Sequence, residues 1–421
     1  MPLAIALLLA FLPAAAGAWD AHALLTWAAL SDEPAVAGAP AVTVETIEAF
    51  LASEGDRLGP LLDAEEAWAR AHVPRYPPRP DELRFDPRGE PATARERFLE
   101  ALRVNPALPL TPHVQQITGQ AAGTRPVLAW SEIGTLPSAP HPGRVAYFRL
   151  RPGERVAPLL VIASASDEPD DGLDVGLFED SGTAFGARYH FGPLPFGDRR
   201  LPFATQAPFH MGFFHETRLL MALAPALGRT YPEVRVHAFA SLARFAFSRG
   251  HAYWGWRFLG FGLHYAQDLT QPYHATAAPG AGTLELVAVS VLDRVGLHGP
   301  RQRRLERLSD EHLALEKAGF ELVSAALAAG DRAAPVVAAL RDTSRDVRLG
   351  AYDDAAPRAR FTAVANAKAP RTAAALQAAL AQGASPEART ALDATLADLL
   401  GDCGAATRVY TRAAAPAPSA T

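Results

Sequence analysis

Two pairs, each of a histidine and a carboxylate, are the residues of this chain whose types and spacing could do chemistry. His264 and Asp268 are four residues apart in the stretch HYAQDLTQPYH, and His312 and Glu316 have the same spacing in HLALE. Side chains four apart lie on one face of a helix. Each pair could therefore offer two ligands to one ion.

The residues around the first pair place it in the interior. The run AYWGWRFLGFGL (252–263) predicts an apolar helix that carries His264 and Asp268 into the core, where an unpaired charge is costly. Pro272 ends that helix, so His274 can turn back toward the same region. A hydrogen-bonded core pair would explain His264 and Asp268 taken alone. The second pair and His274 instead predict ligands for more than one ion, and their nitrogen and oxygen atoms suit zinc.

The composition limits which ligands a metal site in this chain can use and which partners the chain is expected to bind. Cys403 is the single cysteine, which excludes an intrachain disulfide and a zinc site built from thiolates. Hydrophobic residues make up 49% of the 421 residues, as expected of a globular protein. The formal net charge is -5, so no stable nucleic-acid partner is expected.

The first eighteen residues have the pattern of a secretory signal peptide. An apolar run too short to cross a membrane as a helix precedes Ala16, Gly17 and Ala18, which have the small-residue form of a cleavage site. Cleavage after Ala18 would make Trp19 the first mature residue and would make the protein secreted or periplasmic. The alternative is a buried N-terminal helix.

Apolar residues recur mostly at intervals of three and four, which predicts an all-α, multi-helix bundle. We expect one helical domain over 19–405, with 32–156 as an irregular insertion or lid and 406–421 as a flexible tail. Within the insertion, RVAYFRLRP (144–152) is typical of a strand. The expected helices cover 20–31, 43–54, 57–72, 93–103, 157–166, 207–228, 233–248, 252–269, 300–329, 371–382 and 386–401.

The motif H-x-x-x-D-x-x-x-P-x-H over 264–274, followed by His312-x-x-x-Glu316, resembles the signature of the zinc-dependent phospholipase C family. That family shares an all-helical, three-zinc core with the fungal single-strand nucleases. Its members begin, after signal removal, with a tryptophan whose amino and carbonyl groups bind zinc, and a histidine follows. Trp19 and His22 in WDAH match these positions. The resemblance covers about 19–31 and 160–330.

The family also has an aspartate and a histidine between the first helix and residue 264. Asp167 in DEP matches the aspartate, with Asp170 as the alternative, and His190 in RYHFGP matches the histidine. The aspartate matching Asp167 is also a proposed general base in the phospholipases, so the resemblance implies a catalytic role for it. Residues 32–156 match nothing in the family.

The resemblance implies three zinc ions. The first would be held by Asp167, His190, His264 and Asp268. The second would be held by the amino and carbonyl groups of Trp19 with His22, and Asp268 would bridge the first two ions. The third would be held by His274, His312 and Glu316.

The expected function is a secreted, zinc-dependent phosphodiester hydrolase, most simply a phospholipase C that cleaves phospholipid head groups. Glu316 favours this choice because the phospholipases have glutamate there and the nucleases have aspartate. The expected partners are a phospholipid or other phosphodiester substrate and a transient membrane surface, and the expected state is a monomer. The alternatives are a single-strand nuclease or nucleotidase on the same core, and a non-catalytic secreted binding module.

Two further features of the sequence are expected to lie outside the metal site. His210 and His215 in FHMGFFH are five apart, which does not align them on one helix, so we expect a core or rim role for both. The basic run RQRRLERL (301–308) is expected to be a solvated helix face.

Overall fold

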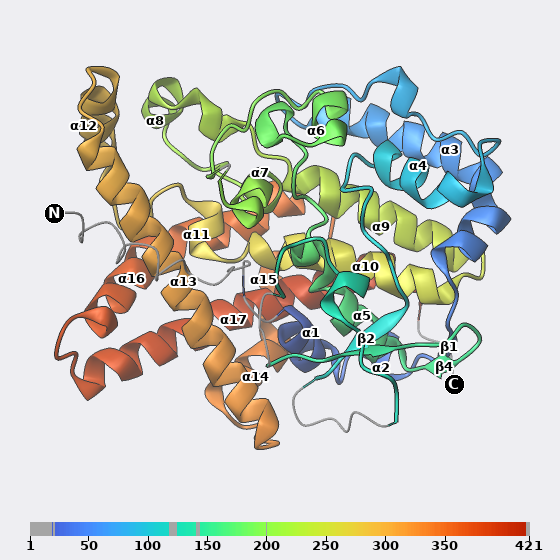
Figure 1. The fold of residues 1–421 in the computed structure, drawn as a ribbon. Coiled ribbons are helices and arrows are strands. Elements are labelled where there is room, and N and C mark those ends of the chain that lie inside the picture. Colours follow the sequence, from blue (N-terminus) through green and yellow to red (C-terminus); the bar gives the residue numbers. More distant parts are fainter. Residues whose placement is uncertain (1–18, 20–21, 118–123, 140–143, 199, 418–421) are drawn as a thin grey trace, which may run out of the picture.

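The computed structural model describes residues 19, 22–117, 124–139, 144–198 and 200–417 (Figure 1). The expected signal peptide, residues 1–18, lies outside these. The described chain is mostly helical with two short antiparallel strand pairs, which confirms the all-α class. Among the described helices, none combines the length and apolar character needed to cross a membrane.

Two antiparallel helices form the centre of the molecule. α9 (Pro232–Ser248) packs against α10 (Ala252–Asp268), and every α10 residue from Tyr253 to Asp268 is buried, as the apolar run predicts. α5 (Pro158–Ala165) crosses α10 closely: a Cβ on Gly260 would lie 2.6 Å from that of Ala165. α1 (His22–Leu30) and α17 (Pro386–Ala414) complete the layer around α10.

A second group of helices packs around α17. It comprises α14 (Pro335–Arg341) and α16 (Thr362–Leu380), which pack on α17, and α11 (Pro272–Ala275) and α13 (Gly299–Ala328), which pack on α16. Leu315 and Val323 of α13 share an apolar core with Leu396 and Leu399 of α17 and with Trp19. This core lies beside the C-terminal end of α10, where the two histidine–carboxylate pairs meet.

Described residues of the expected insertion form one side of the main apolar core. α3 (Ile47–His72) and α4 (Ala94–Ala101) contribute to the same apolar cluster as α9 and α10. The Phe50 ring lies 6.1 Å from that of Trp254 and 5.8 Å from that of Phe258. The described residues of segment 32–156 therefore pack against the helical bundle and share its core.

The strand-like run is confirmed as a strand. β3 (Tyr147–Arg149) pairs with β2 (His113–Gln115), with Val114 opposite Phe148. β1 (Val42–Thr43) pairs with β4 (Arg155–Val156) and closes the two ends of the insertion on each other.

Several boundaries differ from expectation. The helices expected over 43–54 and 57–72 are one helix, α3, because Phe50, Glu54, Leu58 and Leu62 bury one continuous face across Pro60. The helix expected over 207–228 breaks into α7 (Ala207–His210) and α8 (Arg218–Leu223). There the backbone N–H of Gly212 donates to the carbonyl of His274 instead of continuing the helix.

The flexible tail expected from residue 406 is wrong up to Ala414, which ends α17. Ala406, Val409 and Tyr410 are buried in the main core, so this turn is held by packing. The remaining helices are α2 (Pro34–Ala37), α6 (Ala184–Tyr189), α12 (Thr283–Arg294) and α15 (Asp346–Leu349). Short 3-10 turns lie at 81–83, 91–93, 130–132, 168–171, 179–181, 202–206, 225–228 and 343–345, and a π-helical turn lies at 357–361.

Candidate metal centre

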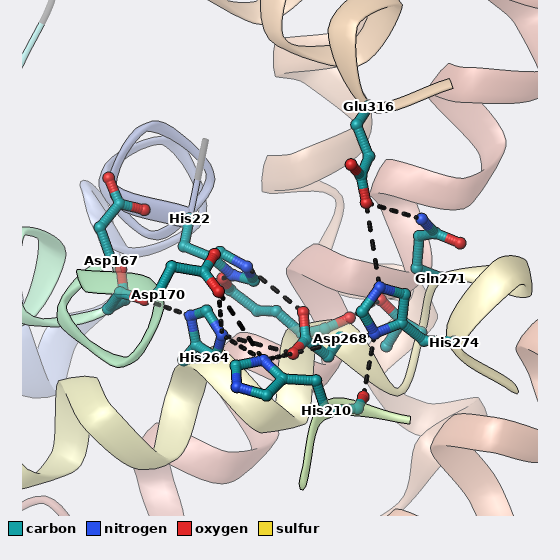
Figure 2. Close-up of polar contacts among 12 residues, drawn as sticks. His22, Asp167, Asp170, His210, His264, Asp268, Gln271, His274 and Glu316 are labelled. Atoms are coloured by element: carbon teal, nitrogen blue, oxygen red, sulfur yellow. Dashed lines mark hydrogen bonds and ion pairs between the residues drawn. The ribbon is translucent and has the colours of Figure 1, made fainter. Parts of the chain in front are cut away.

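Side chains from six elements converge at the C-terminal end of α10 (Figure 2). They are His264 and Asp268 of α10, His22 at the start of α1, Asp170 of the 3-10 turn after α5, His210 of α7, His274 of α11, and His312 and Glu316 of α13. Elements far apart in sequence are thus needed to complete the group that α10 begins.

Asp268 is the centre of this cluster and is fully buried. Its Oδ2 lies 3.0 Å from Nδ1 of His210 and 3.4 Å from Nε2 of His264, and its Oδ1 lies 3.3 Å from Nε2 of His22. The Asp268 Oδ1 and His22 Nε2 atoms face each other yet form no hydrogen bond of good geometry. Atoms arranged around a common point in this way fit ligands of a shared cation.

The cluster contains two adjoining groups that could each hold a metal ion. One is His22, Asp170 and His264, and the other is His210, His264 and Asp268. In each group the donor atoms lie within 4.8 Å of one another, and every member is buried. Because His264 belongs to both groups, two ions here would be close neighbours.

A third metal-compatible group joins α11 to α13. Nε2 of His312 lies 2.6 Å from Oε1 of Glu316, and Nε2 of His274 lies 3.0 Å from Nε2 of His312. The i, i+4 spacing of His312 and Glu316 does place both on one helix face, as predicted. The turn at Pro272 also brings His274 to them.

Hydrogen bonds behind the histidines orient their free nitrogens into the cluster. Nδ1 of His22 faces Oε1 of Gln267 at 2.7 Å, Nδ1 of His264 faces the Ser166 carbonyl at 2.8 Å, and Nδ1 of His274 faces the His210 carbonyl at 2.9 Å. Each of these oxygens can only accept, so each Nδ1 carries a proton and each Nε2 points into the cluster. Such outer partners are typical of metal-ligating histidines.

His210 has a charged outer partner. Its Nε2 lies 3.5 Å from Oδ2 of the buried Asp174, while its Nδ1 faces Asp268. Arg235 fixes Asp174 by an ion pair of 2.7 Å. Burial raises the pKa of Asp174, but the Arg235 charge outweighs it and holds that pKa below its ordinary value. Asp174 therefore stays ionised and orients the His210 ring.

His210 was expected to be a core or rim residue, and the structure instead places it inside the cluster. His190, expected there, caps the C-terminal end of α6 with φ 56 and is exposed. A short histidine motif in a loop contains no periodic element that would set the direction of its side chain. His190 therefore matched the family motif although it lies outside the cluster. The useful signal was the apolar PF preceding His210, which buries α7.

Asp167 also differs from expectation, and Asp170 takes its place. Figure 2 shows the Asp167 carboxylate pointing away from the cluster, where its Oδ1 accepts from the backbone N–H of Ala23 at 2.9 Å. Oδ1 of Asp170 lies 3.6 Å from Nε2 of His264 and accepts from Nε2 of Gln206 at 2.9 Å. The 3-10 turn over 168–171 rotates the two side chains to different sides.

Two contacts from the insertion hold this acidic turn. The Asn105 side chain donates to the Gly172 carbonyl at 3.1 Å, and the N–H of Thr135 donates to the Asp171 carbonyl at 2.9 Å. From α10, the buried Arg257 pairs with Glu168 at 2.7 Å. The insertion therefore helps to position a candidate ligand.

Trp19 lies near the centre but its side chain is not a ligand. Its indole is buried against Gly319, one turn beyond Glu316 on α13. Residues 20 and 21, which join it to His22, lie outside the described residues. The role expected of its amino and carbonyl groups stays a prediction.

The electrostatics of the cluster favour cations. Burial lowers the pKa of His22, but the Asp268 carboxylate 3.3 Å away outweighs it and raises that pKa to about 9. Burial would raise the pKa of Asp268, yet the surrounding imidazoles hold it well below its ordinary value. Burial lowers the pKa of His312 to about 4, so this ring is neutral and can act as a ligand. An ionised buried carboxylate among neutral and protonated imidazoles is an arrangement that a dication would stabilise.

The assignment of His210, and not His190, as a metal ligand can be tested with matched variants. His210→Asn is expected to lower metal affinity by about tenfold or more, because a ligand nitrogen is lost between Asp268 and Asp174. His190→Asn is expected to leave affinity unchanged, since asparagine tolerates a positive φ. Competition with a chromophoric chelator measures both. Equal losses in the two variants would contradict the placement.

No protein-family model, curated protein or solved structure matches this chain. The interpretation of the centre therefore depends on its own geometry and on the motif over 264–274.

Proposed function

We propose that the chain is a zinc-dependent phosphodiester hydrolase, most simply a phospholipase C acting on phospholipid head groups. The observation that carries the proposal is the convergence of three adjoining metal-compatible groups around Asp268, in which every member except His312 is buried. The resemblance of residues 264–274 and of His312 and Glu316 to the phospholipase motif supports the same conclusion.

Two ligands in this proposal differ from those that the resemblance implied. Asp170 takes the place of Asp167, and His210 takes the place of His190. The first zinc ion is assigned to Asp170, His210, His264 and Asp268. The second would be held by His22 and Asp268, which would belong to both sets, with the amino and carbonyl groups of Trp19 once residues 1–18 are removed. The third is assigned to His274, His312 and Glu316. Only nitrogen and oxygen ligands are used, as zinc accepts.

The residues of the candidate centre have different roles in the proposed reaction. Closely spaced dications, when bound, lower the pKa of water, neutralise phosphoryl oxygens and stabilise the leaving alkoxide. Asp170 is placed to accept the proton, because its side chain is 10% exposed whereas that of Asp268 is wholly buried. Gln206 orients the Asp170 carboxylate through its hydrogen bond. His312, at 18% exposure, faces the more open side, from which a substrate can approach.

Removing the metal is expected to abolish turnover. Hydrolysis of a phosphatidylcholine analogue should disappear after treatment with a chelator and return when zinc is added back, because in the proposed reaction the bound ions would supply the charge that activates water and neutralises the phosphoryl oxygens. Release of the phosphorylated head group is the measurement. Absence of turnover on every phospholipid class by protein that carries its full zinc content would contradict the phospholipase assignment.

The second candidate is a single-strand nuclease or nucleotidase on the same core. The observation that favours it is the short spacing from Trp19 to His22, which is nearer that of the nucleases. Single-stranded DNA and phospholipid offered to one preparation separate the two activities. A zinc content below about one ion per chain would instead favour a non-catalytic binding module.

Export is part of the proposal because the second ion needs a free amino group. Sequencing the N-terminus of the mature protein tests it directly. A first residue other than Trp19 removes the amino ligand from the second ion.

A further inference from the structure

We propose that a helical arm, residues 283–308, docks on the surface of an anionic lipid bilayer. The arm consists of α12, the connecting residues 295–298 and the first turns of α13. Figure 1 shows α12 at the edge of the molecule beside α8. The inference goes beyond the proposed hydrolysis, because binding by the arm needs no metal ion.

Exposed apolar side chains are concentrated on the arm. α12, with the sequence TLELVAVSVLDR, has no buried residue among the side chains that the structure describes. Five of the nine large apolar side chains that are exposed in the described chain belong to the arm. They are Leu284 at 83%, Val291 at 47%, Val295 at 68%, Leu297 at 57% and Leu305 at 46% exposure. An apolar concentration of this kind marks an interaction surface.

The arm is basic although the chain is acidic. Its five arginines against three carboxylates (Glu285, Asp293 and Glu306) give a formal charge of +2, whereas the whole chain has -5. Two arginines are paired: Arg304 lies 3.1 Å from Glu285, and Arg301 lies 3.8 Å from Asp293. Arg303 and Arg307 form no ion pair with any described residue and are exposed. These free charges are complementary to anionic lipid head groups.

The arrangement fits a bilayer surface better than a protein groove. The exposed residues Leu284 and Val291 of α12 and its C-cap Val295 lie seven and four apart on one face, and Leu297 follows at the tip, whereas the other large apolar residues of α12 are half-buried. Arginine stems beside apolar side chains can keep their charges at the head groups while the stems lie on the apolar layer. α12 has 12 residues, well short of the ~20 that span a bilayer, so the arm would lie in the interface.

The position of the arm relates it to the candidate metal centre. α13 continues from Leu305 to His312, a rise of about 10 Å along one helix. His312 is more exposed than Asp170, Asp268 or Glu316. Docking through the arm would therefore hold the more open side of the centre near the lipid head groups.

Binding of the full chain to vesicles tests the proposal. The wild type should sediment with vesicles of phosphatidylcholine mixed with phosphatidylglycerol, and about tenfold less with phosphatidylcholine alone or at high salt. Val295→Ser with Leu297→Ser, and separately Arg303→Glu with Arg307→Glu, should each lower binding about tenfold or more. None of these residues belongs to the metal centre, and head-group release followed in the same tubes separates binding from hydrolysis.

Matched controls come from the rest of the surface. Val347→Ser with Leu380→Ser removes a valine at 85% and a leucine at 55% exposure, and Arg70→Glu with Arg389→Glu reverses two exposed helical arginines. Both controls should bind vesicles as the wild type does, and circular dichroism verifies that every variant is folded. The proposal is overturned if the wild type does not bind, or if the arm variants bind like the controls. A change of oligomeric state in the arm variants without vesicle binding also overturns it, because the arm would then cover protein.

Discussion

Asp268→Asn is expected to empty the two adjoining groups of metal and to lower hydrolysis by about 10³-fold or more. The reason is its position: Asp268 is fully buried and lies within 3.4 Å of imidazole nitrogens of His22, His210 and His264. An amide at this position removes the negative charge and replaces one ligand oxygen by an NH₂ group. Metal content by plasma mass spectrometry and turnover of a phosphatidylcholine analogue are the measurements.

The matched control is a buried aspartate outside the centre. Asp346 pairs with Arg408 at 2.7 Å and with Arg412 at 2.8 Å. Asp346→Asn should destabilise the fold by about 3–5 kcal/mol, since it leaves buried arginine charge uncompensated. It should nevertheless keep the full metal content. Full metal content in Asp268→Asn would refute the central role of Asp268.

The two neighbouring aspartates of the acidic turn should behave very differently. Asp170→Asn is expected to lower both metal affinity and turnover by about a hundredfold or more, because its carboxylate is a proposed ligand and proton acceptor. Asp167→Asn should leave metal content and turnover near wild type. Its expected cost is about 1 kcal/mol of stability, since it weakens the hydrogen bond to Ala23 at the start of α1.

Isothermal titration with zinc, kcat, and denaturant unfolding separate the two outcomes. The same substitution three residues apart on one turn controls for loop disruption. If Asp167→Asn loses the metal while Asp170→Asn keeps it, Asp167 is the ligand and Asp170 is not.

The structural role of the insertion differs from the one that its sequence suggested. Proline-rich segments and one strand indicated an irregular lid, but Phe50 packs on Trp254 and Phe258 of α10, and Asn105 and Thr135 bind the backbone of the acidic turn. The insertion therefore supports the centre from behind. Its composition could not reveal this, because the partners are more than thirty residues away in the chain.

The sequence by itself determined the local parts of this protein. The all-α class and the α10 helix followed from apolar periodicity. The shared faces of His264 with Asp268 and of His312 with Glu316 followed from helix geometry, which depends only on spacing. The turn of His274 toward them followed from Pro272. These features need no information from distant residues.

Only the tertiary structure decided which loop residues complete the centre. Asp170 replaced Asp167 because a 3-10 turn, held by contacts from the insertion and from α10, rotates one carboxylate inward and the other toward α1. His210 replaced His190 because α7 is buried while the end of α6 is exposed. A loop has no repeat that fixes the direction of its side chains. Long-range packing therefore sets that direction, and it cannot be read from spacing.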